Sequence, residues 1–332
     1  MAVYTHISAE EMAGLIAQFD VGDLASAKGI AEGVQNSNFL IETTGSQGQG
    51  AQGQGAQGQG ARFILTVYES RAVIDDLPFF LGLLDHLSAT GCPVPRTIHD
   101  RAGDSFQPFK GKALALIEFL QGVSLDAPTP AQARSVGRAL AQLHLAAASF
   151  PDRRENDLGL AGWHRLAEAC EAAFDSMHAD LGPLVSQQLA ALDSQWPEDL
   201  PVAAIHADLF PDNVLMRGDK VTGLIDFYFA CTDMLAYDVA ITHAAWCFSA
   251  DGARFDPAIS AALLEGYNSL RPLTATEHAA LPVLARGAAL RFTLTRAYDW
   301  IHTPADALVT KKDPMAFARR LQFYIANPQI FS

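Results

Sequence analysis

The stretch from His206 to Asp226 constrains the fold of this chain more than any other. It contains the pattern H-x-D-x-x-x-x-N, formed by His206, Asp208 and Asn213, and it ends in the run Ile-Asp-Phe around Asp226. In between, residues 215–225 form two short apolar stretches separated by the turn signal Arg-Gly-Asp-Lys. This pattern predicts a β-hairpin, which would bring Asp226 back to the neighbourhood of Asp208 and Asn213.

Three oxygen-bearing side chains gathered in this way suit phosphoryl transfer. That reaction needs an acceptor oxygen placed in line and a metal ion that neutralises the phosphate charge. Asp208 is the candidate catalytic residue, because it can orient and deprotonate a hydroxyl. Asn213 and Asp226 are the candidate metal ligands, since an amide and a carboxylate oxygen suit a hard cation such as Mg²⁺. The alternative is an unrelated turn and strand, because each piece is common alone.

The spacing is that of the kinase catalytic loop, and Asp226 to Tyr228 stand where a kinase has Asp-Phe-Gly. The chain resembles the aminoglycoside phosphotransferase and choline kinase group, whose fold is that of protein kinases. Within that group it resembles the kinase-like form of homoserine kinase. The matching segments run through almost the whole chain and comprise residues 28–39, 76–81, 205–213, 223–231 and 286–300.

The resemblance implies an α+β fold with two lobes. The small N-terminal lobe, residues 1–118, would hold an antiparallel sheet and bind nucleotide, and the larger, mainly helical lobe, residues 119–332, would hold the catalytic and substrate groups. It implies that ATP and Mg²⁺ are used to phosphorylate the hydroxyl of L-homoserine, which yields O-phospho-L-homoserine on the route to threonine. Two alternatives stay open: another acceptor, such as choline, methylthioribose or an aminoglycoside, or an inactive nucleotide-binding regulator.

Two strands are expected on either side of a loop that contains Gly29 and Gly33. Backbone N–H groups in such a loop can bind phosphates, although two glycines between strands also make an ordinary turn. The resemblance implies that Gly29, Gly33, Asn36 and Ser37 contact the nucleotide. It also implies that backbone groups near Glu118 and Leu120, at the end of an apolar strand, pair with adenine.

The strand predicted at residues 62–69 departs from the kinase pattern. Thr66 stands where a kinase has the lysine that holds the α- and β-phosphates, and the glutamate partner of that lysine is not evident. Lys28 or Arg71 could supply the missing charge, or magnesium and backbone groups could suffice. Thr66 is the feature that favours an inactive regulator, and the intact trio at Asp208, Asn213 and Asp226 argues against one.

Two helices are expected in the N-terminal lobe. Residues 8–19 open with Ser8 as N-cap and Glu11 placed to complete a capping box. Residues 76–90 are expected to begin at Asp76 as the cap, with Pro78 in the first turn. In the C-terminal lobe, helices are predicted at residues 130–148, 162–179, 183–196, 258–267, 275–286 and 288–301.

Four further residues of the C-terminal lobe are candidates for supporting roles. By resemblance, Asp238 begins a helix and receives the hydrogen bonds that hold the catalytic loop, although N-capping alone would explain an aspartate there. His206 is expected to brace the same loop. Arg291 or Arg296 could form a guanidinium fork for a substrate carboxylate, and the alternative for each is a salt bridge within the lobe.

Composition limits the partners. The net charge of −14 argues against nucleic acid or an anionic membrane as the main partner, because both favour basic surfaces. Four widely spaced cysteines and the lack of a secretory signal or an apolar membrane-spanning run predict a cytosolic protein with reduced thiols. Residues 46–61, a Gly/Gln-rich repeat, predict a flexible loop expansion. The sequence does not indicate an oligomeric state.

Overall fold

The structure is a computed structural model that describes residues 5–30, 36–44, 60–69, 71–303 and 311–331. Its contacts divide the chain into two units, Met1–Gln121 and Gly122–Ser332, whereas the sequence suggested a boundary between residues 118 and 119. Gly33 and nearly all of the Gly/Gln-rich segment lie outside the described residues.

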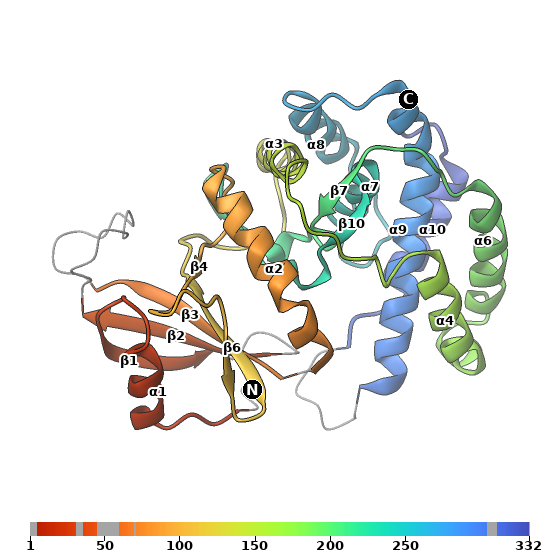
Figure 1. Cartoon of the computed structure of the whole chain (residues 1–332). Coiled ribbons are helices and arrows are strands. Elements are labelled where there is room, and N and C mark those ends of the chain that lie inside the picture. The colour runs from red at the N-terminus through yellow and green to blue at the C-terminus, as the bar shows by residue number, and fades with distance from the viewer. Residues whose placement is uncertain (1–4, 31–35, 45–59, 70, 304–310, 332) are drawn as a thin grey trace. The chain divides into compact units, whose positions relative to one another are not determined.

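The first unit is built on an antiparallel sheet, as predicted (Figure 1). Neighbouring strands follow the order β1-β2-β3-β6-β4, and β5 also pairs with β6. The strands are β1 (Asp23–Ile30), β2 (Asn36–Thr44), β3 (Arg62–Tyr68), β4 (Thr97–Ile98), β5 (Gln107–Phe109) and β6 (Lys112–Glu118). The inner strands β3 and β6 are the most apolar, because both of their faces are covered, and Leu65 and Leu116 are completely buried.

Helix α1 (Ala9–Ile16) has the capping box expected from the sequence. The backbone N–H of Glu11 donates to Ser8 Oγ at 3.2 Å, and the backbone N–H of Ser8 donates to Glu11 Oε2 at 2.9 Å. These two bonds satisfy donors that a helix start leaves free. The buried face of the helix, which includes Met12 and Ile16, joins the core on the sheet.

Helix α2 (Arg71–Ala89) starts earlier than the sequence suggested, so the prediction of Asp76 as its cap was wrong. Pro78 lies inside the helix rather than in its first turn. An interior proline costs about 3 kcal/mol or more, because it lacks a donor and crowds the preceding turn. Packing offsets this cost: Leu77 and Phe80 are buried, and α2 contacts β3, β4 and β6.

The second unit is mainly helical, with two small sheets. Figure 1 shows the long helix α9 running beside α10 and α4, which both contact it. The helices are α3 (Pro130–Ala147), α4 (Leu160–Cys170), α5 (Phe174–Met177), α6 (Leu181–Gln195), α7 (Leu235–Trp246), α8 (Pro257–Asn268), α9 (Ala275–His302) and α10 (Met315–Ala326). The antiparallel strand pairs are β7 (Val202–Ile205) with β10 (Cys231–Met234), and β8 (Val214–Arg217) with β9 (Lys220–Leu224).

Two predictions about helix breaks were wrong. The helix expected at residues 162–179 is interrupted by the 3₁₀ turn Glu171–Ala173 between α4 and α5. Conversely, the two helices expected on either side of Gly287 form the single helix α9. A Cβ at Gly287 would lie 2.3 Å from the ring of Trp196, so the glycine makes room for an aromatic contact. That contact offsets the roughly 1 kcal/mol that glycine costs inside a helix.

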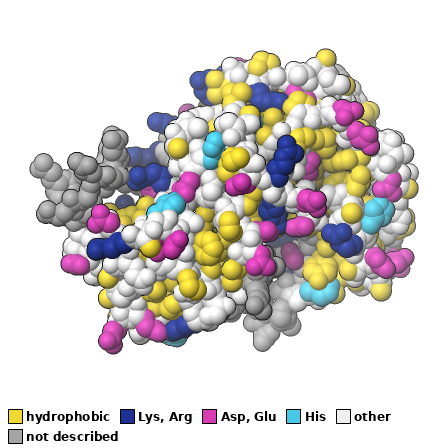
Figure 2. Space-filling model, in the orientation of Figure 1, with side chains coloured by type: hydrophobic (Ala, Val, Ile, Leu, Met, Phe, Trp, Pro, Cys, Tyr) yellow, Lys and Arg dark blue, Asp and Glu magenta, His cyan; other side chains and the backbone are white. Residues whose placement is uncertain are grey.

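The surface carries both signs of charge. Figure 2 shows acidic side chains spread over the visible face among basic ones, rather than gathered in one patch. The four cysteines, Cys92, Cys170, Cys231 and Cys247, are buried free thiols. Within the described part of the chain, no helix combines the length and the apolarity needed to cross a bilayer.

Helices α3 and α8 approach each other closely through two glycines. A Cβ at Gly137 would lie 2.0 Å from the backbone oxygen of Leu263, and a Cβ at Gly266 would lie 2.0 Å from that of Arg134. Because these neighbours are backbone atoms, the helices would have to separate to accept a side chain. We therefore expect Gly137→Ala to lower the free energy of unfolding by about 1–3 kcal/mol, as overpacking does, measured by urea denaturation.

Gly14→Ala is the matched control for that substitution. Gly14 lies on the exposed side of α1, and a Cβ there meets nothing within 4 Å. We expect this change to stabilise the protein by about 0.4–1 kcal/mol, through the smaller conformational freedom of the unfolded chain. Equal effects of the two substitutions would contradict the close contact between α3 and α8.

Candidate active site

The predicted hairpin is present and joins the two halves of the sequence pattern. Strands β8 and β9 pair from Val214↔Leu224 to Arg217↔Lys220. The hairpin closes with a hydrogen bond of 3.0 Å from the backbone N–H of Ile225 to the backbone oxygen of Asn213. Asp226, the next residue, therefore emerges beside the catalytic loop.

Asn213 is tied directly to Asp208. Its amide nitrogen donates to the backbone oxygen of Asp208 at 2.8 Å and to the carboxylate oxygen Oδ2 at 3.1 Å. Asn213 is buried, and it ends the 3₁₀ turn Pro211–Asn213. Because the nitrogen is engaged with Asp208, the amide oxygen is the atom that would take a cation.

Electrostatics favour a cation at this site. Burial raises the pKa of Asp208 to about 7; the charge of Arg291 opposes this rise and that of Asp226 adds to it. Burial likewise raises the pKa of Asp226 to about 6, with a further contribution from Asp212. A positive ion between two carboxylates that repel each other would stabilise both as anions.

The donor set fits magnesium. Mg²⁺ is usually bound by one or two carboxylates together with substrate phosphates and water, rather than by a cage of protein groups. Among the described residues, no three His, Cys, Asp or Glu side chains form such a cage. Asn213 and Asp226 offer one neutral and one anionic oxygen, and they therefore fit an ion shared with a nucleotide.

His206 connects the catalytic loop to the hairpin. Its Nδ1 accepts from the backbone N–H of Asp208 at 3.2 Å, and its Nε2 lies 3.0 Å from the backbone oxygen of Ile225. These partners require a neutral ring with the proton on Nε2. Burial lowers the pKa of His206, which favours that neutral form. The contacts are those expected of a brace, and the effect on catalysis stays a prediction.

Asp238 holds the loop from the other side. The backbone N–H groups of His206 and Ala207 donate to its two carboxylate oxygens, at 2.8 Å and 2.9 Å. The alternative of N-capping does not apply, because Met234 is the N-cap of α7 and no side chain caps that helix. Although burial acts in the opposite direction, the hydrogen bond from His144 and its charge lower the pKa of Asp238.

Asp238 is one end of a buried chain of polar side chains that the sequence did not predict. His144 Nε2 lies 3.1 Å from Asp238 Oδ2, and His144 Nδ1 lies 2.8 Å from the hydroxyl of Tyr267. Arg271 donates to that hydroxyl at 2.9 Å and to Glu277 at 2.7 Å. Glu277 completes the capping box of α9. The sequence signal that could have predicted this capping box is Thr274 followed three residues later by Glu277.

The two candidate substrate arginines occupy different surroundings. Arg291 is buried, with 1% of its surface exposed, and it donates to the backbone oxygen of Ala207. Arg296 is half-buried and donates to the backbone oxygen of Asp313 at 3.2 Å. Burial lowers the pKa of Arg296, and the charges of Asp313 and Asp208 oppose this, so Arg296 lies within the field of the Asp208 carboxylate.

A second cation near the carboxylates was not predicted. Lys312 lies 3.5 Å from Asp212 and 5.8 Å from the ring centroid of Phe210. Its charge opposes the rise in the pKa of both Asp208 and Asp226. A lysine in a polar C-terminal segment has no local pattern that marks it as part of this site.

Thr66 supplies no charge in the first unit. Its hydroxyl is buried and donates to Asn38 Oδ1 at 2.8 Å. Lys28 is exposed on β1, and the side chain of Arg71 lies outside the described residues. A cation that the sequence did not single out, Lys112, is ion-paired with Glu69 beside the end of β3.

The predicted nucleotide contacts at the start of β2 are both buried. The hydroxyl of Ser37 donates to Glu69 Oε1 at 2.6 Å and accepts from the backbone N–H of Thr5 at 3.1 Å. Asn36 Oδ1 has no hydrogen-bond partner among the described residues, which leaves it available to a ligand. Their contact with a nucleotide stays a prediction.

Glu118 and Leu120 end the strand β6 and the segment after it. The backbone N–H of Glu118 donates to the backbone oxygen of Arg96 at 2.9 Å, so it is not available to adenine. The carboxylate of Glu118 pairs with Arg96 Nε at 3.1 Å. Leu120 is half-buried, and an adenine contact by the remaining backbone groups stays a prediction.

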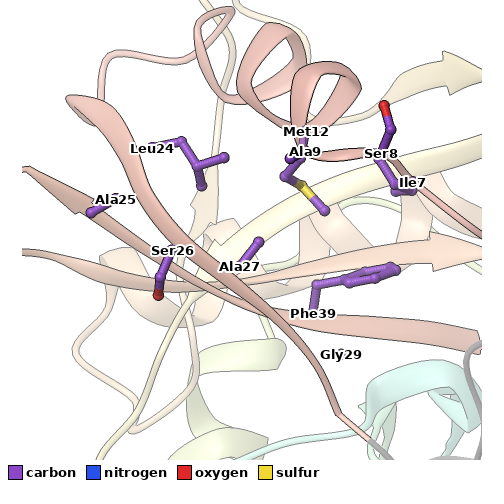
Figure 3. A pocket seen from close by; sticks show the side chains of 10 residues that line it. All are labelled: Ile7, Ser8, Ala9, Met12, Leu24, Ala25, Ser26, Ala27, Gly29 and Phe39. Atoms are coloured by element: carbon purple, nitrogen blue, oxygen red, sulfur yellow. The ribbon is translucent and has the colours of Figure 1, made fainter.

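Gly29 borders a pocket of about 310 Å³ in the first unit. Figure 3 shows its lining side chains, which come from the start of α1, from β1 and from Phe39 on β2. None of the lining residues carries an ionisable group; they are Ile7, Ser8, Ala9, Met12, Leu24, Ala25, Ser26, Ala27, Gly29 and Phe39. The pocket therefore offers apolar contact and hydroxyl groups rather than charge.

Comparisons with known proteins identify the relatives of this chain. The model of the phosphotransferase enzyme family matches residues 26–273. The chain is 49% identical over 324 residues to the homoserine kinase of Methylobacterium radiotolerans, which covers 98% of this chain and 96% of that one. It is 50% identical over 324 residues to the homoserine kinase of Rhodopseudomonas palustris, covering 97% and 94%.

Solved structures share the fold at low sequence identity. A spectinomycin phosphotransferase in complex with ADP and spectinomycin has a TM-score of 0.69 at 14% identity, covering 98% of this chain and all of that one. An amicoumacin kinase in complex with AMP-PNP, Ca²⁺ and Ami has a TM-score of 0.66 at 14% identity, covering 96% of this chain and 94% of that one. These matches confirm the predicted two-lobed kinase-like α+β fold.

Proposed function

Because the chain belongs to the phosphotransferase enzyme family, we propose that it transfers the γ-phosphoryl group of ATP to the side-chain hydroxyl of L-homoserine. The observation that carries the proposal is near-half identity, over almost the whole chain, to relatives named homoserine kinase. The site supports it, since Asp208, Asn213 and Asp226 are held together by the hairpin and by the bonds of Asn213 to Asp208. The product would be O-phospho-L-homoserine, on the route to threonine.

Asp208 orients the acceptor hydroxyl and takes its proton. A pKa of about 7 suits a base that works near neutral pH, because the group is partly ionised and still basic. Asn213 holds the Asp208 carboxylate in place through its amide nitrogen. Mg²⁺, bound by Asn213 and Asp226, would neutralise the phosphate charge when present. His206 and Asp238 position the loop through its backbone.

The nucleotide is assigned to the first unit. Backbone groups around Gly29 and Gly33 would lie against the phosphates, and Asn36 and Ser37 would contribute at the start of β2. Backbone groups near Glu118 and Leu120 would hold adenine. Asn36 Oδ1 supports this assignment, because it is buried without a hydrogen-bond partner in the part of the chain that the structure describes, and such an acceptor favours a ligand that donates.

Arg296 is assigned to the carboxylate of the acceptor. Its guanidinium lies 4.5 Å from the ring centroid of Phe317 and uses one nitrogen on the backbone oxygen of Asp313. The remaining nitrogens can form a fork with a carboxylate. This favours an amino acid over choline, since a quaternary ammonium ion is bound by aromatic cages.

The cytosol is the compartment that four buried free thiols favour.

The test is magnesium-dependent ADP production by the purified protein. The acceptors are L-homoserine, L-serine, choline, methylthioribose, an aminoglycoside and 3-aminopropan-1-ol, which is homoserine without its carboxylate. We expect the highest kcat/KM with homoserine. Selective turnover of a different acceptor would replace the substrate and keep the reaction. Nucleotide binding without phosphorylation of any acceptor would favour an inactive regulator and direct attention to Thr66.

Arg296→Gln tests the acceptor site in the same assay. We expect kcat/KM for homoserine to fall roughly ten- to hundredfold, which corresponds to a lost charged hydrogen bond of about 1.5–3 kcal/mol. Turnover of 3-aminopropan-1-ol is expected to change little, because it has no carboxylate. Arg134→Gln is the control, since it removes an exposed arginine that pairs with Glu265. Equal losses with both acceptors would refute a carboxylate contact.

A further inference from the structure

Ala207, between His206 and Asp208, has a backbone conformation that L side chains rarely adopt. Its φ is 61°, in the left-handed region, where a Cβ crowds the following carbonyl group. The residue is buried, with 1% of its surface exposed. Backbones of this kind persist where the surrounding structure holds them in place. The peptide unit that precedes the catalytic carboxylate therefore requires an external restraint.

That restraint comes from two buried charges of opposite sign. The backbone N–H of Ala207 donates to Asp238 Oδ1 at 2.9 Å, and its backbone oxygen accepts from Arg291 Nη1. Asp238 lies on α7 and Arg291 lies on α9. Asp238 alone would fix only the side of the residue that faces His206. Arg291 fixes the side that leads directly into Asp208.

The surroundings of Arg291 keep it rigid and away from solvent. Its guanidinium carbon lies 4.6 Å from the ring centroid of Phe292 and 5.6 Å from that of Phe229. Only 1% of its surface is exposed. Its Nη1 atom already donates to Ala207, and the burial of the whole side chain leaves no guanidinium nitrogen at the surface for a substrate carboxylate to reach. These contacts favour a role for Arg291 in holding the protein backbone rather than in binding the substrate.

We propose that Arg291 is a positioning residue, which holds Ala207 in its left-handed conformation and thereby aims the Asp208 carboxylate, without touching the substrate. The inference rests on the proposed function only in so far as phosphoryl transfer is the reaction measured. It differs from the sequence-based prediction that Arg291 binds the carboxylate of the acceptor. The two ideas predict different changes in kcat and KM.

Arg291→Met is the first test, because methionine preserves an unbranched apolar stem between the two rings and removes the donor. We expect kcat to fall roughly tenfold to a hundredfold, as a displaced catalytic group does. KM for the acceptor is expected to change by less than about threefold, because binding is not the step affected. A large rise in KM for homoserine, with kcat retained, would instead support the substrate fork.

Ala207→Gly in the Arg291→Met background is the decisive second test. Glycine adopts positive φ about as readily as negative φ, so it needs less restraint. We expect the double variant to recover at least about threefold in kcat over Arg291→Met, whereas Ala207→Gly alone lowers kcat slightly or not at all. Loss of packing at Arg291 would not be repaired by this change. Absence of any recovery would overturn the proposal.

Arg320→Met is the matched control. Arg320 is also buried and also donates to backbone oxygens, but it lies on α10 and its bonds go to Ala244, Ser249 and Ala250, outside the catalytic loop. We expect Arg320→Met to lower the stability of the protein, and we expect Ala207→Gly to bring no recovery of kcat in that background. If Arg291→Met does not fold, Arg291→Lys takes its place, with a smaller loss and the same recovery. Rates are measured with whichever acceptor the wild type uses, so failure of the homoserine assignment leaves this test intact.

Hydrogen exchange at the Ala207 amide provides a readout that needs no turnover. This amide is protected by Asp238 while the left-handed conformation is kept. We expect faster exchange in Arg291→Met than in the wild type, and slower exchange again in the double variant. Unchanged exchange in Arg291→Met would show that Arg291 does not restrain the loop, even if the protein phosphorylates none of the acceptors tested.

Discussion

Asp208→Asn is expected to lower kcat by roughly 10²–10⁴-fold, the usual contribution of a general base. An asparagine has the same shape and can still accept the bond from Asn213 through its amide oxygen, so the loop should keep its structure. It cannot take a proton from the acceptor hydroxyl. The measurement is ADP production at saturating substrates, together with calorimetric titration of the nucleotide, which should bind as in the wild type.

Asp212→Asn is the control for the charge. Asp212 lies in the same loop and is exposed, where it pairs with Lys312 at 3.5 Å. The substitution removes one negative charge near the site and leaves the proposed base in place, so we expect kcat within about threefold of the wild type, since an exposed pair contributes little. Near-normal turnover by Asp208→Asn would show that the base has been assigned to the wrong residue.

Asp226→Asn is expected to raise the magnesium concentration needed for half-maximal rate and to lower kcat. Asp226 is the only anionic member of the proposed pair of metal ligands, and it directly follows the hairpin whose end is bonded to Asn213. Loss of a partner outside the first ligand shell already costs roughly 10–100-fold in metal affinity or activity. We expect the loss of a direct ligand to cost at least as much.

The measurement for Asp226→Asn is the rate as a function of magnesium at fixed ATP and acceptor. Part of the lost kcat should return at high magnesium, and Mn²⁺ is expected to rescue better than Mg²⁺, because it binds such ligands more tightly. In Asp208→Asn the same titration should leave kcat low at every metal concentration. An unchanged magnesium dependence in Asp226→Asn would exclude Asp226 as a ligand.

The local features of the fold could be predicted from the sequence. The capping box at Ser8 and Glu11 and the hairpin that ends at Asp226 depend on neighbours within a few residues, and the structure contains both. Helix breaks were harder to predict. Gly287 reads as a break and Pro78 as a first-turn residue, but both lie inside helices. Packing against residues distant in sequence decided these two cases.

The candidate site likewise contains residues that a local sequence pattern predicts and others that depend on distant contacts. Asp208, Asn213 and Asp226 form one local pattern, and the structure brings their backbones together. The restraints on the loop come from afar, because Arg291 and Ala207 are 84 residues apart. No local sequence pattern predicts which group a buried charged side chain on α9 will contact. The same limit explains why the sequence did not single out Lys112, whose partner Glu69 is 43 residues away.

The chain of side chains from Arg271 to Asp238 begins at a group that can only donate. Arginine has no acceptor, so Arg271 must donate to the Tyr267 oxygen. The hydroxyl proton of Tyr267 is then free to go to His144 Nδ1, and the ring proton on Nε2 goes to Asp238. A cation near the start of α9 is thus connected, through Tyr267 and His144, to a carboxylate under the catalytic loop. That carboxylate accepts from His144 and from the backbone N–H groups of His206 and Ala207, so one acceptor ties the helical lobe to the loop.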